Sequence, residues 1–242
     1  MTCALITTDW TTKGMKEGDW TMYKRVMGVL LVLILVGQPV WACRPLATND
    51  CGTVEVDAIE MEIGVDWVDN DNERNSAVNV TLTTGLTKRL DFAVAIPYEI
   101  NESGEQGLSS AELGMKFVLV RNFISFTFGY ILGSPGYTIN SILSKSIGLT
   151  TIHFNLGFTS TGDVKEAVIT SLGGAIEYPV LKRLILVGEV TAEASSTIVW
   201  EMLIGAYLPV SESLMIDFGV GRGLSKENNS MLKGTLGLTY AF

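Results

Sequence analysis

From about residue 57 to the C-terminus, apolar residues recur at every second position along the chain. In the first such stretch, Ile59, Ile63 and Trp67 fall on one face, while Glu60 and Asp66 fall on the other. A period of two is that of a β-strand whose two faces meet different surroundings. The same pattern predicts twelve strands, near residues 59–67, 78–86, 90–99, 111–117, 124–130, 137–147, 152–158, 168–178, 184–194, 198–208, 214–220 and 232–242. The phase of 137–147 is ambiguous, so its faces stay unassigned, and 184–194 begins apolar on both faces.

The connections between these strands alternate in character. Tight turns are expected at 87–89, 120–122, 148, 179–183 and 209–213, and looser polar stretches at 70–75, 101–107, 133–136, 161–165 and 226–229. Strands of roughly 9–13 residues cross a bilayer when tilted, and short turns on one side with longer loops on the other are typical of outer-membrane barrels. The predicted fold class is therefore all-β: a single antiparallel transmembrane β-barrel of about 12 strands over residues 57–242.

The two faces differ in a way that separates a barrel from a soluble β-sandwich. A sandwich packs its apolar face inside and exposes a charged one. Here the polar face is rich in Gly, Ser and Thr, and the apolar face ends in aromatic residues. Trp67, Tyr98, Tyr130 and Trp200 lie toward one end, and Tyr178, Tyr240 and Phe242 toward the other. Aromatic girdles of this kind mark the two interfaces of a bilayer, which favours the barrel with outer-membrane lipid around it.

The last strand ends in the pattern of an outer-membrane assembly signal. A polar residue, a glycine and two aromatic residues stand at Thr235, Gly237, Tyr240 and Phe242, and the chain ends on Phe. We expect this strand to be read by the barrel assembly machinery. The alternative is an edge strand that ends in Phe by chance.

A single long apolar run lies near the N-terminus. Lys24 and Arg25 precede an apolar stretch at 26–37, and Pro39 and small residues follow. This is the arrangement of a secretory signal, so residues 1–42 are predicted to be a signal peptide cleaved after Ala42. Met22 or Met27 is an alternative start, and an uncleaved anchor is the alternative to cleavage. Residues 43–56 would form a periplasmic N-terminal segment ahead of the barrel.

Cleavage after Ala42 would leave Cys43 as the first residue of the mature chain. Cys51 follows eight positions later, and an exported segment permits a disulfide between the two. Lipidation of Cys43 and two free thiols are the alternatives.

Composition and charge narrow the range of functions. The 242 residues are 47% hydrophobic and carry a formal net charge of −9, and the mean hydropathy is +0.32. Nucleic-acid binding requires a basic face, so no nucleic-acid partner is expected. The three cysteines form no CxxC pair and the sole histidine has no neighbouring cysteine, so neither a metal site nor a cofactor is predicted.

The inward faces of the predicted strands carry many more acids than bases. The lumen-facing candidates are Glu60, Glu62, Asp66, Asp91, Glu99, Glu112, Lys116, His153, Asn155, Glu177, Glu189, Glu193, Glu201, Asp217 and Lys233. Because ionised carboxylates are not stable in a dry core without partners, we expect a hydrated lumen of negative potential that favours cations. The alternative is that some of these acids lie at the rims and face water.

His153 is the one residue that raises the question of catalysis. A serine-dependent barrel enzyme needs a serine beside a histidine and a third group that orients it. No serine stands two residues from His153, and His153 falls on the inward face. We therefore predict a lumen or structural role for His153, no catalytic residues and no enzyme activity.

Several short motifs carry a resemblance to a known family. RPLATNDCGTV stands at 44–54, GLTKRLD at 85–91, IPY at 96–98, ELGMK at 112–116, EYP at 177–179 and GVGRGL at 219–224. In this order they resemble the outer-membrane proteins grouped as phenol meta-pathway degradation proteins and often called transporters. Cys51 departs from that pattern. The resemblance implies a barrel that passes aromatic or other hydrophobic compounds, so the leading hypothesis is a small-molecule channel, followed by a closed structural barrel.

Overall fold

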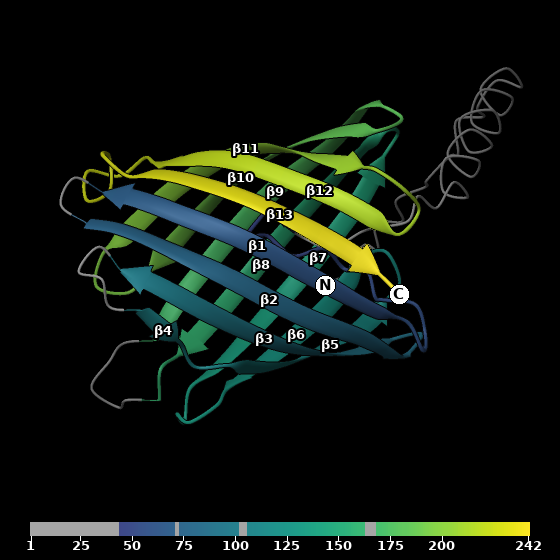
Figure 1. Ribbon diagram of the computed structural model, residues 1–242, viewed down its shortest axis with the longest axis horizontal. Helices are drawn as coiled ribbons and strands as arrows, with labels where there is room; N and C mark the ends of the chain where they lie inside the picture. The colour runs from purple at the N-terminus through teal and green to yellow at the C-terminus, as the bar shows by residue number, and fades with distance from the viewer. Residues whose placement is uncertain (1–43, 71–72, 102–105, 163–167) are drawn as a thin grey trace, which may run out of the picture. The chain divides into compact units, whose positions relative to one another are not determined.

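The computed structural model describes residues 44–70, 73–101, 106–162 and 168–242 of the chain, which form an all-β structure (Figure 1). The strands in these ranges are β1 (Ile59–Asn70), β2 (Glu73–Thr87), β3 (Leu90–Asn101), β4 (Gln106–Leu108), β5 (Glu112–Val120), β6 (Ile124–Ile131), β7 (Tyr137–Ile147), β8 (Thr150–Ser160), β9 (Ile169–Leu181), β10 (Leu184–Ala194), β11 (Ile198–Pro209), β12 (Leu214–Gly223) and β13 (Leu232–Ala241). Each range predicted from the sequence overlaps one of the twelve long strands. The predicted signal peptide and Cys43 lie outside the described residues.

The strands form one closed antiparallel barrel. Each long strand pairs with the next along the chain, and β1 closes the ring by pairing with β13 as well as β2. The short strand β4 pairs with the far end of β3, at Tyr98–Ile100, while β5 pairs with its near end, at Leu90–Ala95. The predicted fold class is therefore confirmed, with one wall position shared between β4 and β5.

The outer surface of the barrel is apolar along its length. Among its exposed hydrophobic side chains are Ile63, Phe128, Phe154 and Leu236. Side chains alternate across a strand, so this exposure follows directly from the period of two in the sequence. No helix among the described residues is long and apolar enough to cross a membrane.

The connections fall into two classes at opposite ends of the barrel. The end with the C-terminus holds the tight turns, such as residues 88–89, 148–149 and 182–183, and we call it the turn end (Figure 1). The opposite end, the loop end, holds longer connections such as 132–136 and 224–231. In outer-membrane barrels the short turns face the periplasm.

The faces of β7 explain why its sequence pattern is ambiguous. Ile142 points into the barrel and is 0% exposed, while Ile139 and Leu143 are exposed on the outside. The outward face also carries Lys145. Ile142 inside and Lys145 outside reverse the usual placement of apolar and charged residues in this strand. An apolar side chain is stable on the inner face here because the interior is packed with protein.

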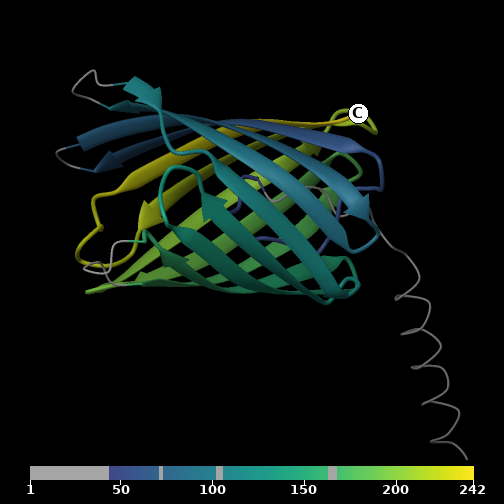
Figure 2. The same cartoon turned by 90° about the horizontal axis from the view of Figure 1, so that it is seen from below.

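Residues 44–56, which the sequence placed in a periplasmic segment ahead of the barrel, lie inside it. In Figure 2 they form the purple trace within the ring of strands. Leu46 packs with inward side chains of four strands, Ala175, Val187, Leu203, Tyr207 and Met215, in the main apolar cluster of the described residues. We call residues 44–56 the inserted segment. The segment lies inside the barrel rather than ahead of it for a physical reason. The inner wall provides an apolar cluster against which Leu46 packs, and side chains that accept hydrogen bonds from the backbone of the segment.

Candidate functional site: the lumen and its inserted segment

The inserted segment follows the inner wall around the barrel. Its successive contacts run from β13 and β12 at Arg44, through β10 at Ala47 and β8 at Asn49, to β7 at Cys51 and β3 at Val54. It then reaches β2, where Asp57 N–H donates to the carbonyl oxygen of Gly85 at 3.1 Å, and continues into β1. The segment therefore contacts most of the circumference of the lumen.

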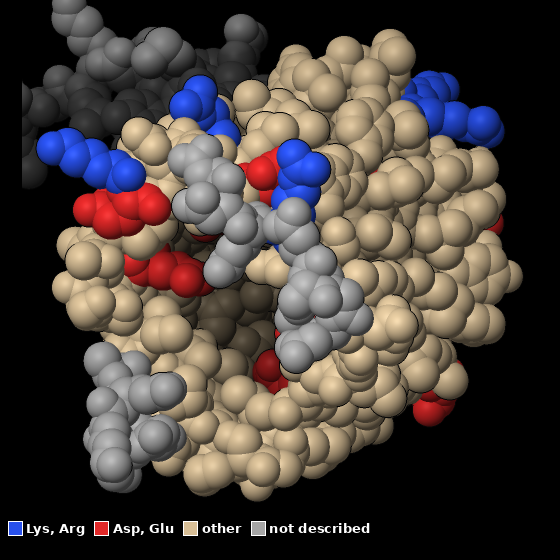
Figure 3. All heavy atoms as spheres, turned by 60° about the vertical axis from the view of Figure 1, so that its left-hand side comes forward, with Lys and Arg blue, Asp and Glu red and all other residues tan. Residues whose placement is uncertain are grey.

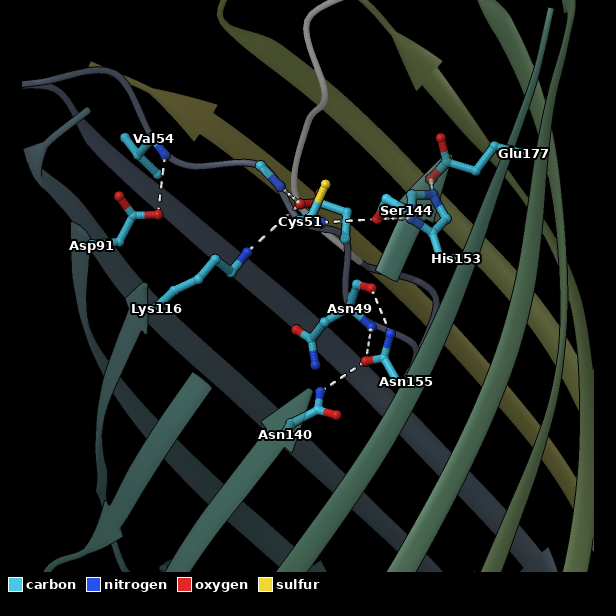
Figure 4. Close-up of polar contacts among 12 residues, drawn as sticks. Asn49, Cys51, Val54, Asp91, Lys116, Asn140, Ser144, His153, Asn155 and Glu177 are labelled. Atoms are coloured by element: carbon cyan, nitrogen blue, oxygen red, sulfur yellow. Dashed lines mark hydrogen bonds and ion pairs between the residues drawn. The ribbon is translucent and has the colours of Figure 1, made fainter. Parts of the chain in front are cut away.

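Backbone N–H groups of the segment are bound by side chains of the wall. Ala47 and Thr48 donate to the two carboxylate oxygens of Glu189, both at 2.9 Å. Asn49 N–H donates to Oδ1 of Asn155 at 2.8 Å, and the amide of Asn155 donates back to the carbonyl oxygen of Asn49 at 2.8 Å (Figure 4). Hydrogen bonds to charged acceptors contribute about 1.5–3 kcal/mol each, so Glu189 is the strongest single anchor of this stretch.

Two further wall residues hold the second half of the segment. Val54 N–H donates to Oδ2 of Asp91 at 3.2 Å. Lys116 Nζ lies 3.6 Å from Oδ1 of Asp50 in an ion pair. Asp91 and Lys116 are themselves direct cross-strand neighbours on β3 and β5, so one acid and one base share this stretch of wall (Figure 4).

Arg44 begins the segment in a cradle formed by β1, β12 and β13. Its two Nη atoms lie 3.4 and 3.1 Å from the two carboxylate oxygens of Asp66, and Nη2 also donates to Oγ1 of Thr235 at 2.6 Å. Nε lies 3.9 Å from Oδ1 of Asp217, whose side chain is 0% exposed. Two of the predicted lumen acids therefore have a cation beside them that comes from the segment.

A hydrogen-bonded network involving His153 holds the middle of the segment. Cys51 N–H donates to Ser144 Oγ at 3.0 Å, and Ser144 Oγ lies 2.8 Å from His153 Nδ1. On the far side, His153 Nε2 is 3.5 Å from Oε1 of Glu177, which also accepts from Tyr207 Oη at 3.3 Å (Figure 4).

This network brings together a serine, a histidine and a carboxylate that the sequence did not connect. Ser144 is nine residues before His153, on the neighbouring strand, and the two are adjacent in register. Their side chains are 5% and 1% exposed, respectively, and Ser144 is already hydrogen-bonded to the segment. The arrangement anchors the segment, in keeping with a structural role for His153.

Cys51 lies within this anchored stretch. It is a free thiol that is 3% exposed. Burial raises the pKa of the Cys51 thiol, with a smaller opposing effect from its hydrogen bond with Ser144. The predicted partner Cys43 lies outside the described residues.

A cavity of about 500 Å³ occupies the lumen beside the segment. The charged residues that line it are Asp50, Glu60, Glu62, Asp91, Glu112, Glu193 and Glu201, with Lys116 and Lys233. Between them lie small and hydroxyl-bearing residues, such as Thr83, Ala93 and Gly114. In Figure 3, which brings the loop end forward, the surface is hollowed and acidic side chains stand beside the hollow.

Most of the remaining predicted residues lie near the ends of the barrel, and Gly237 lies in the middle of β13. Glu99 is exposed near the loop end of β3. At the turn end, the rings of Tyr240 and Phe242 meet edge to face at 4.8 Å, and Phe242 N–H donates to the carbonyl oxygen of Ile59 at 2.8 Å. Gly237 lies under the guanidinium of Arg44. Among the described residues, no three His, Cys, Asp or Glu side chains come together as a metal site.

The sequence reasoning did not identify Arg44, Asp50 and Ser144 as functional residues. Arg44 and Asp50 precede the first strand, where the period of two gives no information about position. Their partners are 191 and 66 residues away at Thr235 and Lys116. No local pattern in the sequence could have found these contacts.

Comparisons with known proteins support the barrel and leave the family open. No protein-family model matches the chain, and no curated protein matches it by sequence. Solved structures do resemble it. The KdgM porin has a TM-score of 0.56 at 10% identity, with 75% of this chain and 99% of that chain covered. The COG4313 outer membrane channel from Pseudomonas putida F1 has a TM-score of 0.56 at 11% identity, with 80% and 98% covered.

A third similar structure is the CymD monoaromatic hydrocarbon channel, with a TM-score of 0.51 at 8% identity over 78% of this chain and 89% of that chain. At such identities the likeness shows the fold, which is that of outer-membrane barrels. This chain therefore shares the architecture of those barrels. These neighbours are porins and channels rather than enzymes, and none of the comparisons supports the phenol-degradation family in particular.

Proposed function

We propose that this protein is an outer-membrane channel for small hydrophilic solutes, with a preference for cations, and that the inserted segment controls passage. The observation that carries the proposal is the cavity, whose lining includes seven carboxylates and two lysines. An excess of fixed negative charge in a narrow bore attracts cations and repels anions. The aromatic or hydrophobic solutes that the family resemblance implies fit this lining less well.

Ion selectivity tests the proposal directly. Purified protein in planar bilayers with a KCl gradient should show a reversal potential whose sign indicates that K⁺ passes more readily than Cl⁻. The double variant Glu60→Gln, Glu62→Gln removes two cavity charges and should lower the preference for cations. Glu212→Gln, in an exposed turn outside the cavity, is the matched control and should leave the reversal potential unchanged. Anion preference in the unmodified protein would refute the proposal.

A closed structural barrel is the second candidate, and the contacts of the inserted segment favour it. Arg44, the Glu189 carboxylate and the Ser144 network hold the segment at three separate places. A barrel closed by this segment in all conditions would pass no solute.

A disulfide that locks the segment to the wall separates the two candidates. A Cβ placed on Gly173 would lie 3.5 Å from the Cβ of Thr48, which suits a disulfide. In a protein whose three native cysteines are Ser, we expect Thr48→Cys, Gly173→Cys to conduct only after reduction. Gly173→Cys alone, the control, should not respond to the reductant. Absence of current in the locked, the reduced and the unmodified protein would favour the closed barrel.

A further inference from the structure

The cradle around Arg44 has the features of a binding site for one chemical group, the guanidinium. Asp66 meets the two Nη atoms with both carboxylate oxygens, at 3.4 and 3.1 Å. Such a paired contact matches the planar fork of a guanidinium, in which two nitrogen atoms donate side by side, whereas an ammonium group has a single nitrogen atom. Asn79 Nδ2 donates to Oδ2 of Asp66 at 2.7 Å, which fixes the orientation of this carboxylate.

Two glycines give the guanidinium its space. Gly64 on β1 and Gly237 on β13 are direct cross-strand partners, next to the pair Asp66 and Thr235. A Cβ at Gly64 would overlap the guanidinium of Arg44, and one at Gly237 would lie 2.8 Å from its Nε. The wall of the cradle therefore leaves space for the planar guanidinium and also carries the negative charge that attracts it.

Asp217 provides an independent indication that the cradle is built for a cation. Its side chain is 0% exposed, and neither carboxylate oxygen has a hydrogen-bond partner among the described residues. The Nε of Arg44, 3.9 Å away, also lacks one. A buried carboxylate without hydrogen bonds is costly, so a cationic donor that approached closer than Arg44 would be stabilised here.

We propose that the cradle is a guanidinium-specific site that small guanidinium-bearing solutes enter in exchange for Arg44, which frees the first part of the inserted segment. This inference rests on the proposed channel and names a class of solute for it. Arg44 is the internal competitor, and its attachment to the chain gives it a high effective concentration. A free solute therefore binds weakly to the unmodified protein and more tightly once Arg44 is removed.

Calorimetry on the full-length protein in detergent tests the site without any need for conduction. The probes are agmatine and putrescine, two dications that differ in one group, guanidinium against ammonium. Agmatine should bind Arg44→Ala at least about tenfold more tightly than putrescine does. Adding Asp217→Asn should weaken agmatine at least about tenfold. Arg74→Ala removes an exposed arginine elsewhere and should leave agmatine binding as weak as in the unmodified protein.

Each outcome decides the proposal. Preferential agmatine binding that depends on Asp217 supports it. Equal binding of the two dications shows general attraction to an acidic lumen and overturns it, as does the absence of agmatine binding. Arg44→Gln, which keeps more of the side chain, carries the same expectation if Arg44→Ala does not assemble. A barrel that passes no current but binds agmatine in this way would refute the channel and retain the site.

Current measurements then test the exchange with Arg44. Agmatine should increase the conductance of the unmodified protein in a saturable manner, while putrescine at the same concentration should not. Agmatine could bind Arg44→Ala and still fail to increase the conductance of the unmodified protein. That result would show that solutes do not displace Arg44, and it would overturn the proposed exchange.

Discussion

At the scale of single residues, some acids of the lumen accept hydrogen bonds from the inserted segment, and others line the cavity. Sequence reasoning expected the inward carboxylates to be stabilised by water in a hydrated lumen. Glu189 is stabilised by two backbone N–H groups of the inserted segment, and Asp66 by a guanidinium. Glu60 and Glu62 line the cavity instead. Some acids of the wall thus hold the segment and others line the open part of the lumen, and Asp91 does both.

The role of Glu189 can be measured through Cys51. The Cys51 thiol is buried and its pKa is raised, so maleimide should label it slowly in a protein whose other cysteines are Ser. Glu189→Gln replaces a charged acceptor by a neutral one, which weakens the anchor by about 1–2 kcal/mol and should raise the labelling rate about tenfold. Glu99→Gln, at an exposed position, serves as the control. An unchanged rate in Glu189→Gln would contradict the anchoring role.

At the scale of the strands, alternation assigns each residue to lipid or lumen. On β10, Val190 is exposed on the outer wall, and its neighbour Thr191 lines the cavity. The strand β7 shows the limit of the rule, since Ile142 lies inside against packed protein. Alternation therefore predicts whether a side chain points outward or into the lumen. Whether an inward side chain meets packed protein or open space depends on what occupies that part of the lumen.

The pair Val190 and Thr191 tests this assignment. Val190→Arg would place a charge toward lipid, which costs roughly 2–4 kcal/mol near the midplane of the bilayer. Thr191→Arg would place the same charge in the cavity, whose lining includes seven carboxylates, and should be tolerated better. Unfolding in urea from lipid vesicles measures both. Equal destabilisation by the two substitutions would mean that the faces are wrongly assigned.

At the scale of the whole molecule, the ring is closed by β1 and β13. The register runs from Glu60 opposite Ala241 to Asp69 opposite Leu232, so the last strand is paired along its full length. Phe242 completes the pairing through its N–H bond to Ile59. Closure pairs β1 and β13 with each other, so that neither of them presents a free strand edge to the lipid, as a transmembrane sheet requires.

We expect deletion of Phe242 to impair assembly. The deletion removes one backbone hydrogen bond and the exposed ring of the proposed assembly signal, and it should lower the amount of heat-modifiable barrel in the outer membrane. Phe158→Ala, which removes an exposed ring from the outer wall of β8, is the control. Equal yields of the deletion and the unmodified protein would count against the assembly signal.

The sequence by itself determined the barrel. Side-chain direction in a strand is a local property with a period of two, so Ile59 to Trp67 and most of the later strands show their faces without knowledge of their neighbours. Turns and loops are equally local, because they depend on short runs of residues such as Thr87 to Arg89. Two wall features were not predicted. One is the direction of the faces of β7, and the other is the division of one wall position between β4 and β5, which pair with different halves of β3.

Only the tertiary structure decided what the lumen contains. Residues 44–56 have no alternation, and their position depends on partners from Asp91 to Thr235 that come together only after the ring has closed. The same holds for Ser144 beside His153, which are adjacent only through the register of β7 and β8. Local sequence sets the direction of a side chain, whereas an inserted segment is selected by the summed hydrogen bonds and packing of a surface that no single strand possesses.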